Sequence, residues 1–443
     1  MAMTTRHAAT TVRDNEKNGE VHDGTAYCNM VRNSNNGTQG DMSCGNGTCD
    51  SKKRNNGWLL PDPFMGPDGE RITSPDQWPA QRAYLADMLQ HRLYGTMPPA
   101  PAELQSETVT ANLMWNGEGI YELMQLTIPA TATPGGVAIR FTVRVCRPNR
   151  SGQSAPAIAL VMPNYTSPDR FCGFCIGEEM LHTAVSRGYA IVGFEIDEAA
   201  PDDAAKFFDS PCIRAYPGYT WRALAVWAWM QSRVIDWLET CDWADWNRIV
   251  ATGHSRFGKT ALCCGLTDTR VAVTAPAGSG CGGMGSLRLQ GNRFGEGIGH
   301  FERIGRMANW FPHWILPEAG AYGTPDGERP YRENELPFDA NILAACTAPR
   351  GLIVVEGLDD GVANQFGTQV SWLAASEVYR FLGAPERCGI HYREGGHAYT
   401  PEDWNVVMDF CDATLRGRNV NATYKIRKDD DAPVGYDWSM PCQ

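Results

Sequence analysis

Hydrophobic residues along this chain first alternate with polar ones and then gather into short unbroken runs. The alternation between residues 105 and 146 predicts antiparallel strands at 125–128 and 139–145, with Pro134-Gly135-Gly136 as a turn. Apolar runs that predict strands buried on both faces lie at 158–162, 189–194, 248–252, 271–274, 352–355 and 390–392. Because these runs are separated by helical patterns, we expect an α/β fold with a mostly parallel central sheet between two helix layers.

Two helical patterns and the composition of the chain ends complete this outline. One helix is expected from Gln77 to Tyr94, where Gly95 and Pro98 follow, and another from Trp221 to Leu238, whose tryptophans we interpret as core. Residues 1–57 are rich in Asn, Gly, Thr and Ser and predict a flexible polar tail. We therefore expect one folded domain over 58–418 and a C-terminal surface tail over 419–443.

The charge balance narrows the classes of partner. The 443 residues have a formal net charge of −12, which argues against a nucleic-acid partner, whose phosphates need a basic surface. No apolar run reaches the length of about 18 residues that a membrane span requires.

The chain has fifteen cysteines, and disulfides persist in oxidising compartments, so we expect a secreted or periplasmic protein. No signal segment is visible in this numbering. The pair Cys172 and Cys175 has metal-ligand or redox spacing, but no second ligand pair accompanies it, so a disulfide or plain packing is favoured. We expect Cys263 and Cys264 to be core, and we expect no metal and no cofactor.

The strongest chemical signal is the stretch 253–259, which reads G-H-S-R-F-G-K. A strand pattern precedes this stretch and a helical pattern follows it. This order is typical of a nucleophile elbow, which exposes Ser255 above the sheet. The spacing departs from the common G-x-S-x-G, since position 257 is Phe and the second glycine is Gly258. An ordinary helix N-cap serine is the alternative interpretation.

A serine nucleophile needs a base and an acid, which in this kind of fold follow it in the order acid, then histidine. His397 lies in a glycine-bearing loop after the last predicted strand and is the expected base. Asp359 and Asp360 follow the strand at 352–355, and we expect Asp360 to be the acid, with Asp359 kept as the alternative. We expect His254 to point away from the site and His391 to be structural, while His300 or His313 could line a pocket.

These blocks together resemble the glucuronoyl esterases, carbohydrate esterase family 15. The stretch 253–259 is similar to the family's G-x-S-R-x-G-K elbow, and further similar blocks lie at 60–63, 94–98, 279–283, 336–339, 348–350 and 395–397. The resemblance implies an α/β-hydrolase fold and a serine esterase that cleaves esters between glucuronate on xylan and an alcohol. It also implies that Arg256 points into the oxyanion site and that Lys259 and Glu296 contact the sugar, with Arg293 as a further binding candidate.

Two positions depart from the family pattern. Many members carry a Glu as the triad acid where this chain has Gly278, so the acid must come from the pair at 359–360. A sugar-stacking tryptophan of the family falls on Val362 here, so either the sugar platform is weaker or Trp310 or Trp314 replaces it.

The resulting hypothesis is a monomeric serine esterase for glucuronate esters, with glucuronoxylan or small esters as substrates. Two alternatives remain open. One is an esterase for acetyl or feruloyl groups on xylan, and the other is a catalytically silent carbohydrate-binding relative.

Overall fold

The computed structural model describes residues 59–162, 176–290, 293–294, 301–323, 332–419 and 435–441, and only the backbone of 160–162, 290 and 293–294. All of them fall within one compact unit. Cys172, Cys175, Glu296 and His300 lie outside the described residues.

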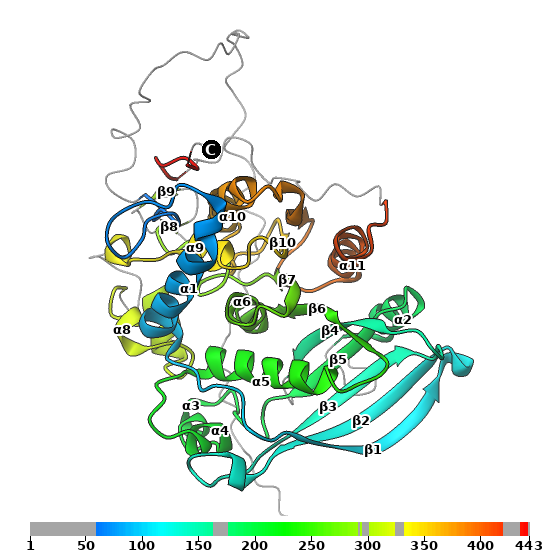
Figure 1. Ribbon diagram of the computed structural model, residues 1–443. Coiled ribbons are helices and arrows are strands. Elements are labelled where there is room, and N and C mark those ends of the chain that lie inside the picture. The colour runs from blue at the N-terminus through cyan, green and yellow to red at the C-terminus, as the bar shows by residue number, and fades with distance from the viewer. Residues whose placement is uncertain are drawn as a thin grey trace, which may run out of the picture. The chain divides into compact units, whose positions relative to one another are not determined.

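A nine-stranded sheet forms the centre of this unit, with the strand order β1-β2-β3-β5-β4-β6-β7-β10-β11 (Figure 1). Its strands are β1 Gln105–Met114, β2 Gly119–Ile128, β3 Ile139–Pro148, β4 Ala155–Met162, β5 Ala190–Glu195, β6 Ala244–His254, β7 Val271–Ala277, β10 Gly351–Gly357 and β11 Cys388–Arg393. The last six strands in the spatial order, from β5 to β11, pair in parallel, whereas β1, β2, β3 and β5 pair antiparallel. The expected mostly parallel α/β sheet is confirmed.

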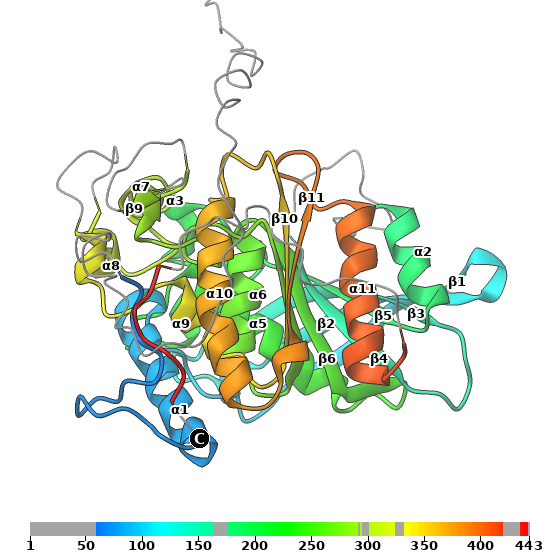
Figure 2. The same ribbon diagram turned by 90° about the horizontal axis from the view of Figure 1, so that it is seen from above.

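Helices cover both faces of this sheet. The helices are α1 Trp78–Leu89, α2 Glu178–Ser186, α3 Ala204–Phe207, α4 Pro211–Ala215, α5 Ala223–Leu238, α6 Arg256–Thr267, α7 Ile304–Trp310, α8 Pro317–Gly320, α9 Ala340–Ala345, α10 Gln365–Phe381 and α11 Pro401–Arg416. Helices α2 and α11 lie on one face, and α5, α6, α9 and α10 lie on the other (Figure 2). Every residue of β5 and of β10 is buried, which explains their continuous apolar runs.

The predicted elements differ from the observed ones mainly at their ends. The first helix gives way to a π-helical segment, Gln90–Tyr94, and stops at Gly95. A Cβ at Gly95 would lie 2.3 Å from the carbonyl oxygen of Thr220, and its φ is +83°, so only glycine fits there. Trp221 lies just before α5, and the tryptophans at 221, 227, 229 and 237 are all buried, as expected of core. The short hairpin of β8 Leu289–Gln290 and β9 Arg293–Phe294 was not predicted.

The chain returns to its own beginning at residues 435–441. The Leu60 N–H donates to the Gly435 carbonyl at 2.8 Å, and the Trp438 indole donates to the Leu60 carbonyl at 3.0 Å. This stretch therefore packs against the start of the described chain, while the boundaries expected at 57 and 418 stay a prediction. None of the helices within the described ranges is both long and apolar enough to cross a membrane.

Candidate active site

Ser255 stands at a sharp turn between β6 and α6. Its backbone has φ 58° and ψ −124°, a conformation that residues other than glycine rarely adopt. Its side chain makes no helix-capping hydrogen bond. A Cβ at Gly253 would lie 2.5 Å from the Phe257 carbonyl oxygen, and one at Gly258 would lie 2.9 Å from the Ala277 carbonyl oxygen. The geometry is that of a nucleophile elbow and not of an ordinary N-cap serine.

The residues that follow neighbouring parallel strands meet Ser255 at the carboxyl edge of the sheet. His397, in the loop after β11, lies with Nε2 2.9 Å from the Ser255 Oγ. Its Nδ1 lies 2.7 Å from the Oδ2 of Asp360, which follows β10. Because a carboxylate accepts at Nδ1, that nitrogen carries the proton, and Nε2 is left to accept the serine hydroxyl.

Asp360 is the aspartate that faces the histidine. It is 1% exposed, and its Oδ1 accepts the N–H groups of Val362 and Ala363 at 2.9 and 3.0 Å. Burial would raise the pKa of Asp360, but the hydrogen bond and charge of His397 and the two backbone donors outweigh it and lower the pKa. Asp359 is exposed, and only its N–H bonds the histidine loop, at the Gly395 carbonyl.

The loop that carries His397 is held against the end of β10. A Cβ at Gly357 would lie 2.5 Å from the carbonyl oxygens of both Gly395 and Gly396, so the two backbones can approach only at glycine. From the other side, the buried Arg393 donates to the carbonyls of Gly396 and Ala398 at 3.0 and 2.6 Å. The histidine is therefore positioned by backbone contacts on both sides.

His254 does not point away from the site, so that expectation was wrong. Its ring centroid lies 4.4 Å from that of His397, because the turn at Ser255 leaves the preceding side chain packed under the histidine loop. Burial, followed by the nearby charge of His397, lowers the pKa of His254 to about 3. Its Nε2 is buried and has no hydrogen-bond partner among the described residues. A neutral imidazole thus supports the ring of His397.

Gly278 follows β7 directly beside these groups. Its φ is +49°, and a Cβ there would lie 3.2 Å from the His254 Nε2 and 3.3 Å from the Asp360 Oδ2. A carboxylate side chain at this position would compete with His254 and Asp360 for the same space. Among the described residues, Asp360 is the carboxylate that contacts His397.

Arg256, the residue after Ser255, is half-exposed and fixed on one edge. Its Nη1 donates to the Oδ2 of Asp202 at 2.5 Å, and its Cζ lies 5.3 Å from the ring centroid of Phe311 and 4.8 Å from that of Trp314. Sequence reasoning missed Asp202, because no motif marks it in the loop between β5 and α3.

Lys259 is 2% exposed and lies one turn after Ser255 in α6. Its Nζ donates to the Ser279 carbonyl at 2.7 Å and to the Oε2 of Glu302 at 2.5 Å. Glu302 was not predicted; Glu296 lies outside the described residues, as does the side chain of Arg293. Within the described chain, Glu302 is therefore the carboxylate that meets Lys259.

The aromatic candidates separate by exposure. Trp310, at the end of α7, is 59% exposed, whereas Trp314 is 2% exposed and donates its indole N–H to Asp202. Trp314 therefore has no free face for a sugar, and Trp310 keeps one. His313, which could have lined a pocket, is buried with Nε2 2.9 Å from the Asp202 Oδ1. His391 lies in β11 with Nε2 3.3 Å from Glu402, as befits a structural residue.

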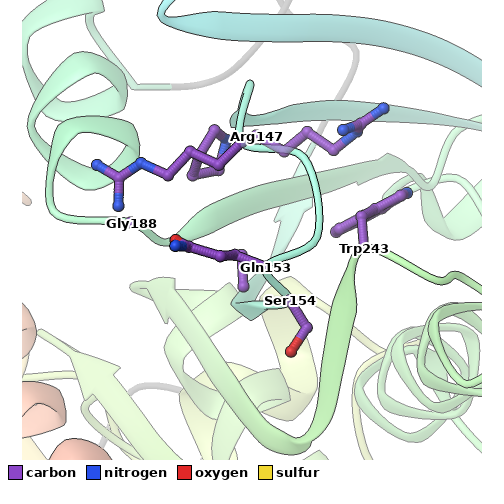
Figure 3. A pocket seen from close by; sticks show the side chains of 8 residues that line it. Arg147, Gln153, Ser154, Gly188 and Trp243 are labelled. Atoms are coloured by element: carbon purple, nitrogen blue, oxygen red, sulfur yellow. The ribbon is translucent and has the colours of Figure 1, made fainter.

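Other possible sites in the described ranges do not involve these residues. A small pocket of about 20 Å³ is lined by Arg147, Gln153, Ser154 and Trp243 among others, next to the start of β4 and thus at the opposite edge of the parallel strands (Figure 3). No group of three or more His, Cys, Asp or Glu side chains that could hold a metal occurs in the described part of the chain. Cys263 and Cys264 are fully buried, as expected of core.

Comparison with known proteins identifies what the chain resembles. A family model described as glucuronyl esterase, fungi, matches residues 130–383. A carbohydrate esterase, MZ0003, from an unknown prokaryotic organism is 27% identical over 81% of this chain and 90% of its own length. A 4-O-methyl-glucuronoyl methylesterase of Podospora anserina is 29% identical over 77% of this chain and 63% of its own length. A solved glucuronoyl esterase of carbohydrate esterase family 15 from Caldicellulosiruptor kristjansonii superimposes with a TM-score of 0.71 at 29% identity, covering 86% of this chain and 97% of that one.

Proposed function

This chain belongs to the glucuronyl esterase family and is a carboxylic ester hydrolase, and from that premise we propose that it hydrolyses esters of glucuronic and 4-O-methylglucuronic acid, as in lignin–glucuronoxylan linkages. The observation that carries the proposal is the continuous chain of contacts from the Ser255 Oγ through His397 to Asp360, at 2.9 and 2.7 Å.

In the proposed reaction, Ser255 Oγ attacks the ester carbonyl carbon while Nε2 of His397 takes the hydroxyl proton. The resulting imidazolium is stabilised by Asp360, whose lowered pKa keeps it ionised. Collapse of the tetrahedral intermediate breaks the bond to the alcohol, which leaves with the proton from His397. Water then attacks the acyl-enzyme by the same route and releases glucuronate. The exchange of protons needs no metal ion and no redox partner.

The developing oxyanion takes its stabilisation from Arg256 in this proposal. Arg256 directly follows the nucleophile as the first residue of α6, at the positive end of the helix dipole. One guanidinium edge is occupied by Asp202, and the remaining N–H groups supply charge-assisted donors, which suit an alkoxide better than neutral amides.

Recognition of the sugar is assigned to Lys259, with Glu302, Glu296, Arg293 and Trp310 as further candidates. Two of the three donors of the Lys259 ammonium are used by Ser279 and Glu302, and Lys259 is 2% exposed, so a sugar hydroxyl would have to reach the third donor at a buried position. The exposed face of Trp310 is available for stacking on an apolar sugar or alcohol surface.

The experiment that tests the proposal compares benzyl glucuronate with acetylated and feruloylated xylan as substrates of the purified enzyme. We expect hydrolysis of benzyl glucuronate and its loss in Ser255→Ala, with an unchanged fold by circular dichroism. Faster turnover of acetyl or feruloyl xylan would replace the proposed substrate class. No labelling of Ser255 by a serine-directed phosphonate would favour a silent carbohydrate-binding relative instead.

The sugar-binding assignment has its own comparison. Lys259→Met and Glu302→Gln should each reduce turnover of benzyl glucuronate more than that of 4-nitrophenyl acetate, because the acetate carries no sugar. Equal losses on both substrates would assign the pair to maintaining the elbow. Export to the cell exterior or periplasm, and a monomeric state, remain proposals that localisation of the native protein and light scattering would test.

A further inference from the structure

Asp202 lies where three separate segments of the chain meet. It belongs to the loop between β5 and α3, and its side chain is 13% exposed. Its Oδ2 accepts from Arg256 Nη1, while its Oδ1 accepts from His313 Nε2 at 2.9 Å and from Trp314 Nε1 at 2.8 Å. A single carboxylate therefore joins the first residue of α6 to the segment between α7 and α8.

The guanidinium of Arg256 is constrained in direction as well as in position. The rings of Phe311 and Trp314 stack with centroids 3.8 Å apart and planes 6° apart, and the Cζ of Arg256 lies within 5.3 Å of both centroids. Among the ion pairs of the described residues, Asp202 is the carboxylate partner of Arg256. The aromatic pair limits where the guanidinium lies, and the carboxylate binds one of its edges.

The two residues that donate to the Asp202 carboxylate are themselves hydrogen-bonded to the start of α5. The carbonyls of His313 and Trp314 accept the first two N–H groups of α5, those of Ala223 and Leu224, at 2.7 and 3.4 Å. Burial would raise the pKa of Asp202, but the donors His313 and Trp314 and the charge of Arg256 outweigh it and lower the pKa. Asp202 is thus anionic at neutral pH and anchored on the side opposite Arg256.

We propose that Asp202 is a positioning residue for ester hydrolysis, which acts by holding the guanidinium of Arg256 so that its unpaired donors face the oxyanion. The inference rests on the proposed function, in which Arg256 stabilises that oxyanion. Pairing with Asp202 reduces the net positive charge that Arg256 offers to the oxyanion. The benefit of Asp202 therefore lies in orienting the guanidinium. Preorganised donors stabilise a transition state without reorganising during the reaction.

The first test replaces Asp202 with asparagine and measures turnover of benzyl glucuronate. An amide offers one acceptor oxygen, so in either orientation its NH2 group faces a donor, either Arg256 or the pair His313 and Trp314. We expect Asp202→Asn to lower kcat about 10- to 100-fold, since displaced catalytic groups typically cost up to about 10², with a much smaller change in KM. Asp203→Asn is the matched control, because Asp203 is an exposed neighbour that caps α3, and it should leave kcat within about twofold.

A double-mutant cycle separates positioning from general support of the structure. In an Arg256→Ala background, Asp202→Asn should lower kcat by no more than about two- to threefold, because the group through which it acts is absent. An equal loss in both backgrounds would overturn the proposal, since Asp202 would then act independently of Arg256.

Two further measurements test the proposal even if Asp202→Asn folds poorly. Asp202→Glu keeps the charge but moves the carboxylate by one methylene, and we expect it to lose at least about tenfold in kcat if orientation decides the rate. Guanidine added to Arg256→Ala should restore more activity with Asp202 present than with Asp202→Asn, and equal rescue would contradict the proposal. Loss of activity in Ser255→Ala together with a normal rate in Arg256→Ala would leave the proposed function intact while removing this inference.

Discussion

At the residue scale, the site depends on side chains that are held in conformations they would not choose alone. His254 is buried and neutral against His397, and Ser255, which is not a glycine, has a positive φ of 58°. Backbone strain of the kind seen at Ser255 costs about 1–3 kcal/mol and persists only where surrounding contacts enforce it. The nearby glycines at 253, 258 and 357 let those contacts form, since each admits a backbone that a Cβ would exclude.

The strain at Ser255 predicts that a glycine variant is more stable than an alanine variant, the reverse of the usual order of stability. Both Ser255→Ala and Ser255→Gly remove the hydroxyl, but only glycine relieves a φ of 58°. We expect Ser255→Gly to be the more stable variant by about 1 kcal/mol, after the larger chain entropy of glycine in the unfolded state is subtracted. Urea unfolding of the two inactive variants measures the difference, and a more stable alanine variant would mean that the turn is relaxed in solution.

The pair of aspartates after β10 predicts an asymmetric response. Asp360→Asn should lower kcat by about 10³–10⁴, because the amide cannot hold His397 in the required tautomer. Asp359→Asn should cost less than about tenfold, since Asp359 is exposed and only its backbone contacts the histidine loop. Steady-state kinetics on benzyl glucuronate decide between them, and the reverse ranking would move the acid to Asp359.

At the element scale, the carboxyl edge of the sheet brings together groups that are far apart in the sequence. The loops after β5, β6, β7, β10 and β11 carry Asp202, Ser255, Gly278, Asp360 and His397 in turn. Because parallel strands end at one edge, each loop needs only a few residues to reach the site, and the helices on both faces keep the strands in register.

The end of α11 is attached to the connection between α2 and β5 by one buried carboxylate, which allows a test of that packing. Asp412 accepts from Arg187, Tyr189, Arg416 and Arg418 at 2.8 to 3.1 Å and is 4% exposed. Asp412→Ala should lower the free energy of unfolding by about 3 kcal/mol, because it leaves these donors without their shared acceptor.

Asp409 is the matched control for this helix. It also pairs with Arg187, but its side chain is 36% exposed, so Asp409→Ala should cost less than about 1 kcal/mol. Both variants should retain the kcat of the unmodified enzyme, since neither lies near Ser255. Similar losses of stability in the two variants would contradict a role for burial in the Asp412 contacts.

At the scale of the whole molecule, the pH dependence of stability depends on buried carboxyl groups, some with lowered and one with raised pKa values. Asp202, Asp268, Asp360 and Asp412 have lowered pKa values, so they stabilise the fold above the pKa of an unfolded Asp, about 3.9, and lose this contribution as the pH falls through their folded values. Glu356 is 1% exposed, and burial and the nearby charge of Asp360 raise its pKa well above the usual value. Since an unfolded Glu loses its proton near pH about 4.3, Glu356 makes the fold progressively less stable as the pH rises above that value.

Glu356→Gln should therefore become more stable relative to the unmodified enzyme as the pH rises from 5 towards 8. Each tenfold difference in proton affinity between the folded and unfolded states corresponds to about 1.4 kcal/mol. Urea unfolding at several pH values measures the difference, and measurements below pH about 4 serve as the control, because Glu356 is then protonated in both states. A difference that does not change with pH would mean that Glu356 is ionised in the folded protein.

The sequence by itself predicted the buried strands of the central sheet, the helices at 77–94 and 221–238, and the candidate triad, with Asp360 as the expected acid and Asp359 as the alternative. Apolar runs reveal buried strands because both faces of a parallel sheet are covered, and the glycines around Ser255 reveal the turn because only they permit it. His397 was found the same way, from a glycine-bearing loop after the last strand. The resemblance to the glucuronoyl esterases, carried by several such blocks, agrees with the matched family model.

Tertiary structure alone decided the contacts between segments that no local pattern connects. Asp202 and Glu302 lie 54 and 43 residues from Arg256 and Lys259, their respective partners, and nothing in their own neighbourhoods marks them. The inward direction of His254 likewise follows from how the loops after β6, β7, β10 and β11 pack together, and the same packing brings Asp360, the acid expected from the sequence, against His397. A sequence pattern records which face of its own element a residue occupies, whereas the partner it meets depends on the packing of several elements at once.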